Sequence, residues 1–121
     1  MMQKLSPEQT LTRLKTSTLK PEDRARNEAI CLLYFVENIK TKTLPLLSVL
    51  DFDLFEGELR LSSKARFQKL NKKTIESIKA HLKKRSESPA KTDFLFVDKQ
   101  GEQISEKTIR SILKAIRMAT Q

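Results

Sequence analysis

Two groups of basic residues in this sequence have the types and spacing of an anion-binding surface. The first lies on two short runs, Glu58–Leu61 and Arg66–Leu70, which a polar connection joins. The second recurs at helical spacing near the end of the chain. Such side chains can neutralise phosphate groups or donate hydrogen bonds to guanine edges. The basic residues are Arg60, Lys64, Arg66 and Lys69 in the first group and Lys107, Arg110, Lys114 and Arg117 in the second.

The sequence offers few groups for covalent catalysis. Its one tyrosine, Tyr34, and its one cysteine, Cys31, lie in the apolar segment 29–36, where we expect both to be part of the core. Its one histidine, His81, falls on a predicted surface helix, and we interpret it as a surface residue rather than a catalytic one. No Gly-rich phosphate loop, metal-ligand spacing or serine-histidine set occurs, so we expect no cofactor and no metal ion.

Composition indicates one compact, basic domain. The chain has 121 residues, and 24 Lys and Arg against 15 Asp and Glu give a formal charge of +9. That excess favours a polyanionic partner, nucleic acid first and an anionic membrane surface second, while a plain solvated basic face is the alternative. The N-terminus lacks the apolar core of a signal peptide, and no apolar run approaches the roughly 20 residues of a membrane span. We therefore expect a cytoplasmic protein that does not enter a membrane.

Local signals place the helices and one hairpin. Ser6, with Pro7 and Gln9 behind it, has the spacing of a capping box, and Asn71 and Ser105 are further helix caps. Gly57 offers the positive φ that a tight entry into the hairpin needs. We predict helices over about 6–15, 21–36, 44–50, 72–84 and 105–119, and a hairpin over about 58–70.

This order predicts an α+β fold that is mostly helical, with helices packed around a small antiparallel hairpin or sheet. The segment 29–36 is apolar nearly all round, so its helix should be central and buried. The stripe Ile75, Ile78 and Leu82 should be the inner face of the helix over 72–84. The order argues against a parallel doubly wound sheet, because no helix separates the two strands.

With this order established, the chain resembles the N-terminal half of the catalytic domain of tyrosine recombinases, the phage integrase family. The resemblance rests on Lys4–Gln9 (KLSPEQ), Asp23–Tyr34 (DRARNEAICLLY), Leu50–Arg60 (LDFDLFEGELR) and Asp93–Leu113 (DFLFVDKQGEQISEKTIRSIL). It implies a protein of the kind that bacteria, phages or plasmids encode. It also implies a double-stranded DNA partner and a family chemistry of strand cleavage and rejoining through a covalent phosphotyrosine.

Carried over residue by residue, the resemblance leaves most of the catalytic set unmatched. Lys40 stands at the position of the first catalytic arginine, and lysine lacks the planar fork that binds two phosphate oxygens. Lys64 matches the lysine of the hairpin loop, although a slip of the alignment would place Arg66 there. The family's His-x-x-Arg motif and tyrosine nucleophile would follow Gln121.

We therefore predict a DNA-binding, recombinase-like module that is inactive alone. The alternatives are a protein-interaction or dimerisation remnant, a fragment of a longer active integrase, and an enzyme completed by a partner chain. A helix-turn-helix regulator that uses 105–119 as its recognition helix is a further alternative. The residues that we predict to contact DNA are Lys40, Lys64, Arg66, Lys107, Arg110, Lys114 and Arg117.

Overall fold

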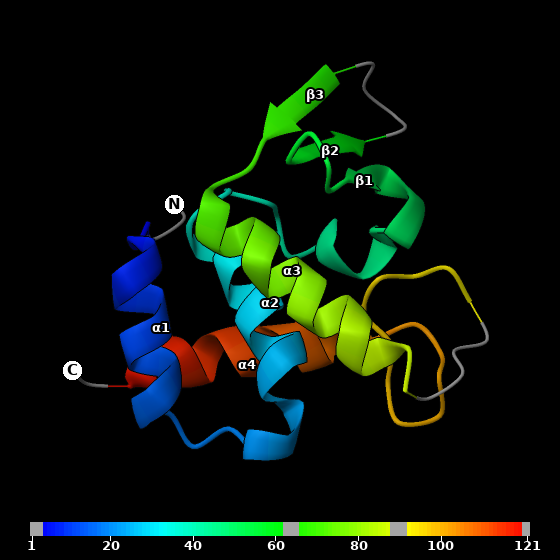
Figure 1. Cartoon of the computed structure of the whole chain (residues 1–121). Coiled ribbons are helices and arrows are strands. Elements are labelled where there is room, and N and C mark those ends of the chain that lie inside the picture. The colour runs from blue at the N-terminus through cyan, green and yellow to red at the C-terminus, as the bar shows by residue number, and fades with distance from the viewer. Residues whose placement is uncertain (1–3, 62–65, 88–91, 120–121) are drawn as a thin grey trace.

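The chain folds as helices packed around one central helix, with a small sheet at one side (Figure 1). The structure is a computed structural model that describes residues 4–61, 66–87 and 92–119. Within them it has the mostly helical α+β fold that the sequence predicts. The α-helices are α1 (Pro7–Thr16), α2 (Arg24–Phe35), α3 (Lys72–Arg85) and α4 (Glu106–Met118), and the strands are β1 (Phe52–Asp53), β2 (Glu58–Leu61) and β3 (Arg66–Lys69).

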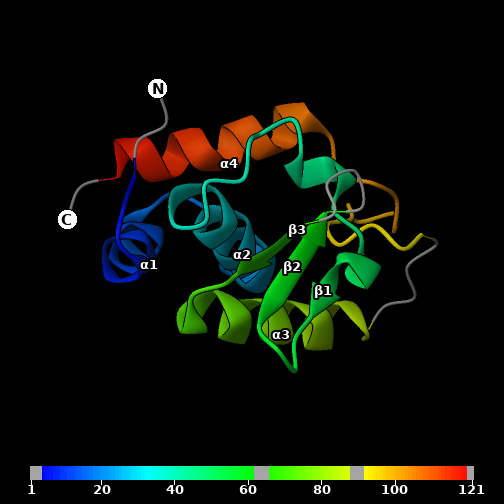
Figure 2. The ribbon, with the colours of Figure 1, turned by 90° about the horizontal axis from the view of Figure 1, so that it is seen from above.

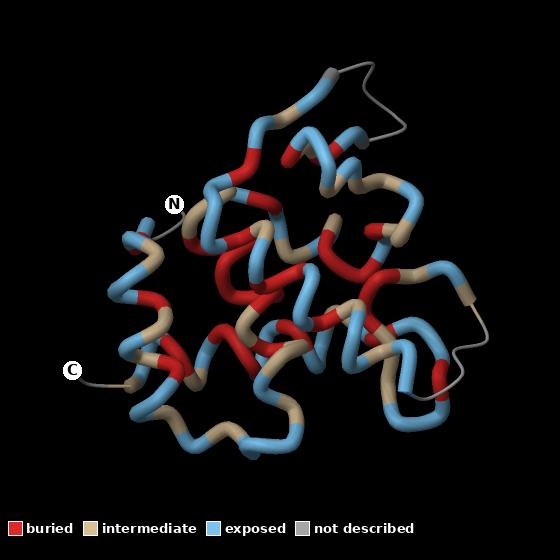
Figure 3. The backbone as a smooth tube through the Cα atoms, viewed as in Figure 1, coloured by how far each residue is buried: buried red, intermediate tan, exposed pale blue. Residues whose placement is uncertain are grey.

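Helix α2 is the centre of the core. Every residue from Ala29 to Phe35 is buried, as the apolar segment predicts. Helices α1, α3 and α4 all pack on α2, and Figure 2 shows α3 and α4 on opposite sides of it. The buried parts of the chain in Figure 3 accordingly gather around α2. The two long helices α3 and α4 therefore present their outer faces to different sides of the molecule.

Side-chain caps set the starts of three helices, at the residues that the sequence indicates. The Ser6 hydroxyl accepts from the Gln9 N–H at 3.0 Å, and the Gln9 side chain accepts from the Ser6 N–H at 2.9 Å. The Asn71 side chain accepts from the Lys73 N–H at 2.9 Å. The Ser105 hydroxyl accepts from the Thr108 N–H at 3.1 Å, and this bond fixes where α4 begins.

The prediction of one helix over 44–50 is wrong. The chain there makes two short 3-10 turns, η2 (Leu44–Leu46) and η3 (Val49–Asp51), separated by extended backbone at Leu47 and Ser48. The cause is pairing with a distant segment. The Leu47 carbonyl accepts from the Leu95 N–H at 2.7 Å, and the Val49 N–H donates to the Asp93 carbonyl at 2.8 Å.

The predicted helix over 21–36 also differs in its first turn. Residues Pro21–Asp23 form a separate 3-10 turn, η1, and α2 begins only at Arg24. Asp23 has φ −98° and ψ 11°, outside the α-helical region, so the backbone bends between the turn and the helix.

The sheet is antiparallel, with strand order β1-β2-β3. Leu59 of β2 is fully buried. The short strand β1, which the sequence did not indicate, pairs Phe52 with Leu59. Gly57 precedes β2 with φ +69°, and a Cβ added there would lie 2.7 Å from Ile75 Cδ1 on α3. The positive φ favours glycine at this turn, and a larger residue would also displace the end of the Ile75 side chain.

The predicted inner face of α3 is confirmed at Ile78, but the buried face is shifted around the helix from the predicted stripe. Its buried residues are Thr74, Ser77, Ile78 and His81, whereas Ile75 and Leu82 are only half-buried at the edges. The interpretation of His81 as a surface residue is thus wrong. His81 lies one turn after Ser77 and Ile78 on the same buried face, so its side chain points inward. There its Nε2 lies 2.7 Å from the Leu95 carbonyl oxygen.

Candidate nucleic-acid interface

The outer face of α4 carries the largest part of the candidate interface. Ile109, Ile112, Leu113 and Ile116 are buried on the inner face, as predicted, so the residues between them point outward. The outward side chains line a groove of about 300 Å³ along the helix. The lining residues are Glu106, Lys107, Arg110, Ser111 and Lys114.

The three cations of this groove differ in how free they are. Arg110 is exposed, but one of its nitrogens bonds the Glu106 carboxylate at 2.8 Å, one helical turn earlier. Lys107 and Lys114 are exposed and have no ion-pair partner among the residues that the structure describes. Because an exposed lysine without a partner loses no internal contact when it meets a phosphate, Lys107 and Lys114 are the most available cations of α4.

Arg117, the last of the predicted cations on α4, is exposed but already has a partner within the protein. Its Nη2 donates to the Tyr34 hydroxyl at 2.6 Å, and its guanidinium carbon lies 5.4 Å from the centre of the Tyr34 ring. Tyr34 is 5% exposed and belongs to the core, as the sequence predicts. Arg117 therefore satisfies a buried hydroxyl that would otherwise lack a partner.

Lys40 lies in a tightly fixed turn after α2. Asn38 has φ +64°, in the left-handed region that asparagine tolerates better than most residues, and this conformation reverses the chain. The Lys40 carbonyl accepts from the Thr43 and Leu44 N–H groups at 2.9 and 3.1 Å. The Lys40 side chain is exposed, so the backbone is held while the ammonium group is free to reach a ligand.

The turn that holds Lys40 is attached to α4. The 3-10 turn η2 packs on α4, and the Gln103 side-chain amide donates to the Pro45 carbonyl at 2.9 Å. Figure 2 shows the segment after α2 running beside α4. Of the residues that we predict to contact DNA, Lys40 and the cations of α4 therefore lie on neighbouring elements of the structure.

The structure describes only part of the hairpin that we predict to contact DNA. Lys64 lies outside the described residues, and of Arg66 only the backbone, as the first residue of β3, is described. The two remaining basic residues of the hairpin have internal partners. Arg60 lies 4.3 Å from the centre of the Phe67 ring, and Lys69 is 3.6 Å from the Glu58 carboxylate.

The one cysteine and the one histidine of the sequence, Cys31 and His81, are both buried. Burial raises the pKa of the Cys31 thiol, and the nearby Glu28 carboxylate adds to that shift. The described residues contain no cluster of His, Cys, Asp and Glu that could hold a metal ion. None of the helices described is both long and apolar enough to cross a bilayer.

Comparison with solved structures identifies recombinases of the same fold. The chain superposes on XerA recombinase with a TM-score of 0.74 and 20% identity, over 99% of this chain and 45% of that one. It superposes on the XerH site-specific recombinase bound to its difH substrate, in a pre-cleavage complex, with a TM-score of 0.68 and 19% identity, over 100% of this chain and 38% of that one. For XerH bound to a palindromic difH substrate, in a post-cleavage complex, the TM-score is 0.67 at 17% identity, over 98% of this chain and 37% of that one.

The sequence comparisons give the family. This chain spans less than half the length of the recombinases that it superposes on. A search of curated proteins gave no match. The model of the phage integrase family matches residues 4–121, almost the whole chain. The chain belongs to the phage integrase family.

Proposed function

We propose that this chain is a module that binds double-stranded DNA through the outer face of α4 and the neighbouring Lys40 turn. The observation that carries the proposal is the pair Lys107 and Lys114. Both are exposed on the outward side of a helix whose inner side is fully buried, and neither has an ion-pair partner among the described residues. A rigid row of free cations on a chain of formal charge +9 is suited to a phosphate backbone.

The individual contacts follow from how each side chain is held. Lys107 and Lys114 neutralise phosphates, and Arg110 exchanges its bond to Glu106 for a phosphate or a guanine edge. Lys40 contacts a phosphate as a point charge, because a lysine lacks the two-pronged donor of an arginine. Lys64 and Arg66 are further candidates for DNA contact, as the family resemblance implies. Relatives of this fold include XerH bound to its difH substrate.

We propose further that the chain does not cleave DNA alone. Cleavage through a phosphotyrosine needs an exposed tyrosine, and Tyr34, the one tyrosine of the sequence, is buried with its hydroxyl bonded to Arg117. Cleavage in this family would require a His-x-x-Arg motif and a tyrosine supplied by further sequence or by a partner chain. The purified chain should therefore form no covalent adduct with a nicked duplex.

The test is duplex binding measured by fluorescence anisotropy across a range of salt concentrations. The logarithm of the affinity should fall linearly with the logarithm of salt, by about 0.9 per phosphate neutralised. Replacing Lys107 and Lys114 together by alanine should lower the affinity and reduce the slope by about 1.8. Lys79→Ala with Lys83→Ala is the matched control, because these two lysines are also exposed on a helix, α3, on the other side of α2.

Two results would contradict the proposal. The first is an affinity of the unmodified chain that does not change with salt. The second is an equal loss of affinity in the α4 variant and the α3 variant, since general positive charge rather than a defined face would then explain the binding.

A further inference from the structure

A small basic pocket lies between the end of α1 and the start of α2, at the other end of α2 from the Lys40 turn. The chain leaves α1 at Thr16 and enters α2 through the 3-10 turn η1 (Figure 1). A cavity of about 160 Å³ lies at this connection, and the polar residues that line it are Lys15, Ser17, Lys20, Arg24 and Asn27. Helix α2 has 12 residues and is therefore about 18 Å long, so this pocket is separate from the Lys40 turn.

The positive charge of this pocket is not compensated. Lys15, Lys20 and Arg24 are all exposed, and none of the three has an ion-pair partner among the described residues. Among the described residues that line the pocket, none is acidic. The pocket therefore has three cations and no carboxylate in its lining, and an anion that enters it displaces no internal ion pair.

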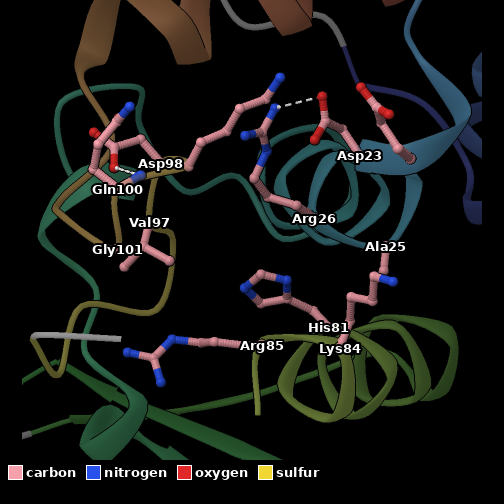
Figure 4. Close-up of a pocket in the computed structure, with 12 residues that line it drawn as sticks. Asp23, Ala25, Arg26, His81, Lys84, Arg85, Val97, Asp98, Gln100 and Gly101 are labelled. Atoms are coloured by element: carbon pink, nitrogen blue, oxygen red, sulfur yellow. Dashed lines mark hydrogen bonds and ion pairs between the residues drawn. The ribbon is translucent and has the colours of Figure 1, made fainter. Parts of the chain in front are cut away.

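The acidic residues nearest to the pocket in sequence face elsewhere. Glu22 and Asp23 line a neighbouring cavity and not this one. Figure 4 shows Asp23 in that cavity, where its carboxylate is 3.7 Å from Arg26. Glu28, one helical turn after Arg24, does not line the pocket and forms no ion pair with Arg24. The neighbouring cavity thus holds acidic as well as basic side chains, whereas this pocket holds only basic ones.

Asn27 supplies a buried donor to the pocket. The residue is only 1% exposed. The Arg26 Nε donates to the Asn27 Oδ1 at 3.1 Å, and because an arginine Nε can only donate, the bonded atom is the oxygen of the amide. The Nδ2 group has no hydrogen-bond partner among the described residues, yet it is not fully enclosed, so it is open to the pocket that Asn27 lines. A buried donor without a partner is costly, and an oxygen atom of a ligand would remove that cost.

The connection that carries these cations is held by hydrogen bonds within itself. The Ser17 hydroxyl donates to the Leu14 carbonyl at 2.8 Å and accepts from the Leu19 N–H at 3.4 Å. The Asp23 N–H donates to the Lys20 carbonyl at 3.1 Å. Because the backbone on both sides of the pocket is fixed, little of it has to be ordered when a ligand binds.

We propose that this pocket binds a phosphate group. Asn27 Nδ2 donates a hydrogen bond to one phosphate oxygen, and Arg24 can bind two further oxygens with its planar guanidinium. Lys15 and Lys20 add positive charge. Since a single water needs only about 15 Å³ of such space, the cavity of about 160 Å³ has room for the four oxygen atoms of a phosphate. The pocket does not depend on the DNA surface of α4.

The experiment follows the Asn27 side-chain amide of the full chain by NMR while inorganic phosphate is added. Sodium chloride at equal ionic strength is the reference. Phosphate should give a saturable change of the Asn27 signal, with half-saturation on the order of 1 mM. Arg24→Gln should weaken the binding by about tenfold. Lys79→Gln is the matched control, because Lys79 is an exposed cation on α3 outside the pocket, and it should leave the half-saturation unchanged.

A second measurement identifies the source of the phosphate. A saturable change with inorganic phosphate and none with a DNA duplex assigns the pocket to a small free phosphate compound. A change with the duplex that Arg24→Gln removes and Lys79→Gln retains assigns it to a backbone phosphate. The variant with Lys107→Ala and Lys114→Ala should bind inorganic phosphate as the unmodified chain does, so this test is independent of the proposed DNA surface.

Two results would overturn the proposal. The first is an Asn27 signal that shows no saturable change with either inorganic phosphate or the duplex. The second is an equal weakening of phosphate binding by Arg24→Gln and Lys79→Gln, since the overall charge of the chain would then explain the response.

Discussion

Arg117 is exposed, but its bond to the buried Tyr34 should make it contribute to folding, whereas a cation without a partner should not. Arg117→Ala removes the 2.6 Å hydrogen bond and leaves the Tyr34 hydroxyl, in a side chain only 5% exposed, without its partner. An unsatisfied buried hydroxyl costs about 1–3 kcal/mol, and the lost contact of the cation with the ring adds about 0.5–1 kcal/mol. We expect Arg117→Ala to lower the free energy of unfolding by about 2 kcal/mol.

The pairwise part of that loss can be measured with a double-mutant cycle. Tyr34→Phe removes the hydroxyl together with its need for a partner, so it should cost only about 0.5–1.5 kcal/mol. In the Tyr34→Phe background, Arg117→Ala should cost about 1 kcal/mol less than it does in the unmodified chain. Urea unfolding followed by circular dichroism gives the four free energies, and equal m-values would show that the denatured state is unchanged.

Lys114→Ala is the matched control, because Lys114 is an exposed cation one turn earlier on the same helix. Its effect on the free energy of unfolding should lie within about 0.5 kcal/mol of zero, while its effect on DNA affinity should exceed that of Arg117→Ala. If the two alanine variants unfold alike and the cycle gives no coupling, the reasoning is refuted. Arg117 would then be a free side chain, as available to DNA as the sequence pattern predicts.

Three further predictions concern the fold. Ser77→Ala should raise the free energy of unfolding by about 1 kcal/mol, because the Ser77 hydroxyl is buried with no partner in the described structure, and a lower midpoint in urea would contradict this. Asn38→Ala should lower that free energy by about 1 kcal/mol and Asn38→Gly should not, since φ is +64° there, and equal thermal midpoints would argue against this strain. The pKa of His81 is lowered in the folded state, so the unfolded chain binds more protons and stability should decrease as the pH falls below about 6.5, the ordinary value for histidine. His81→Gln should flatten that part of the pH profile of the thermal midpoint, and an unchanged profile would exclude His81 as its cause.

Features that depend on nearby sequence could be predicted. The caps at Ser6, Asn71 and Ser105 act within three residues, and the apolar pattern of 29–36 is enough to place its helix in the core. The amphipathic period of α4 likewise gave the buried Ile109 and the exposed Lys107 on opposite faces.

Features that depend on distant partners could not be predicted. The segment 44–50 is held extended at its middle by residues 93–95, which no local propensity reports. His81 is buried because the inner face of α3 is centred on Ile78 together with the hydroxyl residues Thr74 and Ser77, and not on the whole predicted stripe. The role of Arg117 depends on Tyr34, which is 83 residues away in the sequence. Hydrophobic periodicity gives the polar side of a helix, but not which of its cations already has a partner in the fold.

The most direct test of the DNA surface is a map of amide chemical shifts on adding a duplex of about 20 base pairs, long enough for the one or two helical turns that such modules cover. The largest changes should fall on α4 between Lys107 and Lys114 and on the turn around Lys40, with little change at Lys79 and Lys83 on α3. Changes concentrated on α3, with α4 and the Lys40 turn unaffected, would contradict the proposed interface.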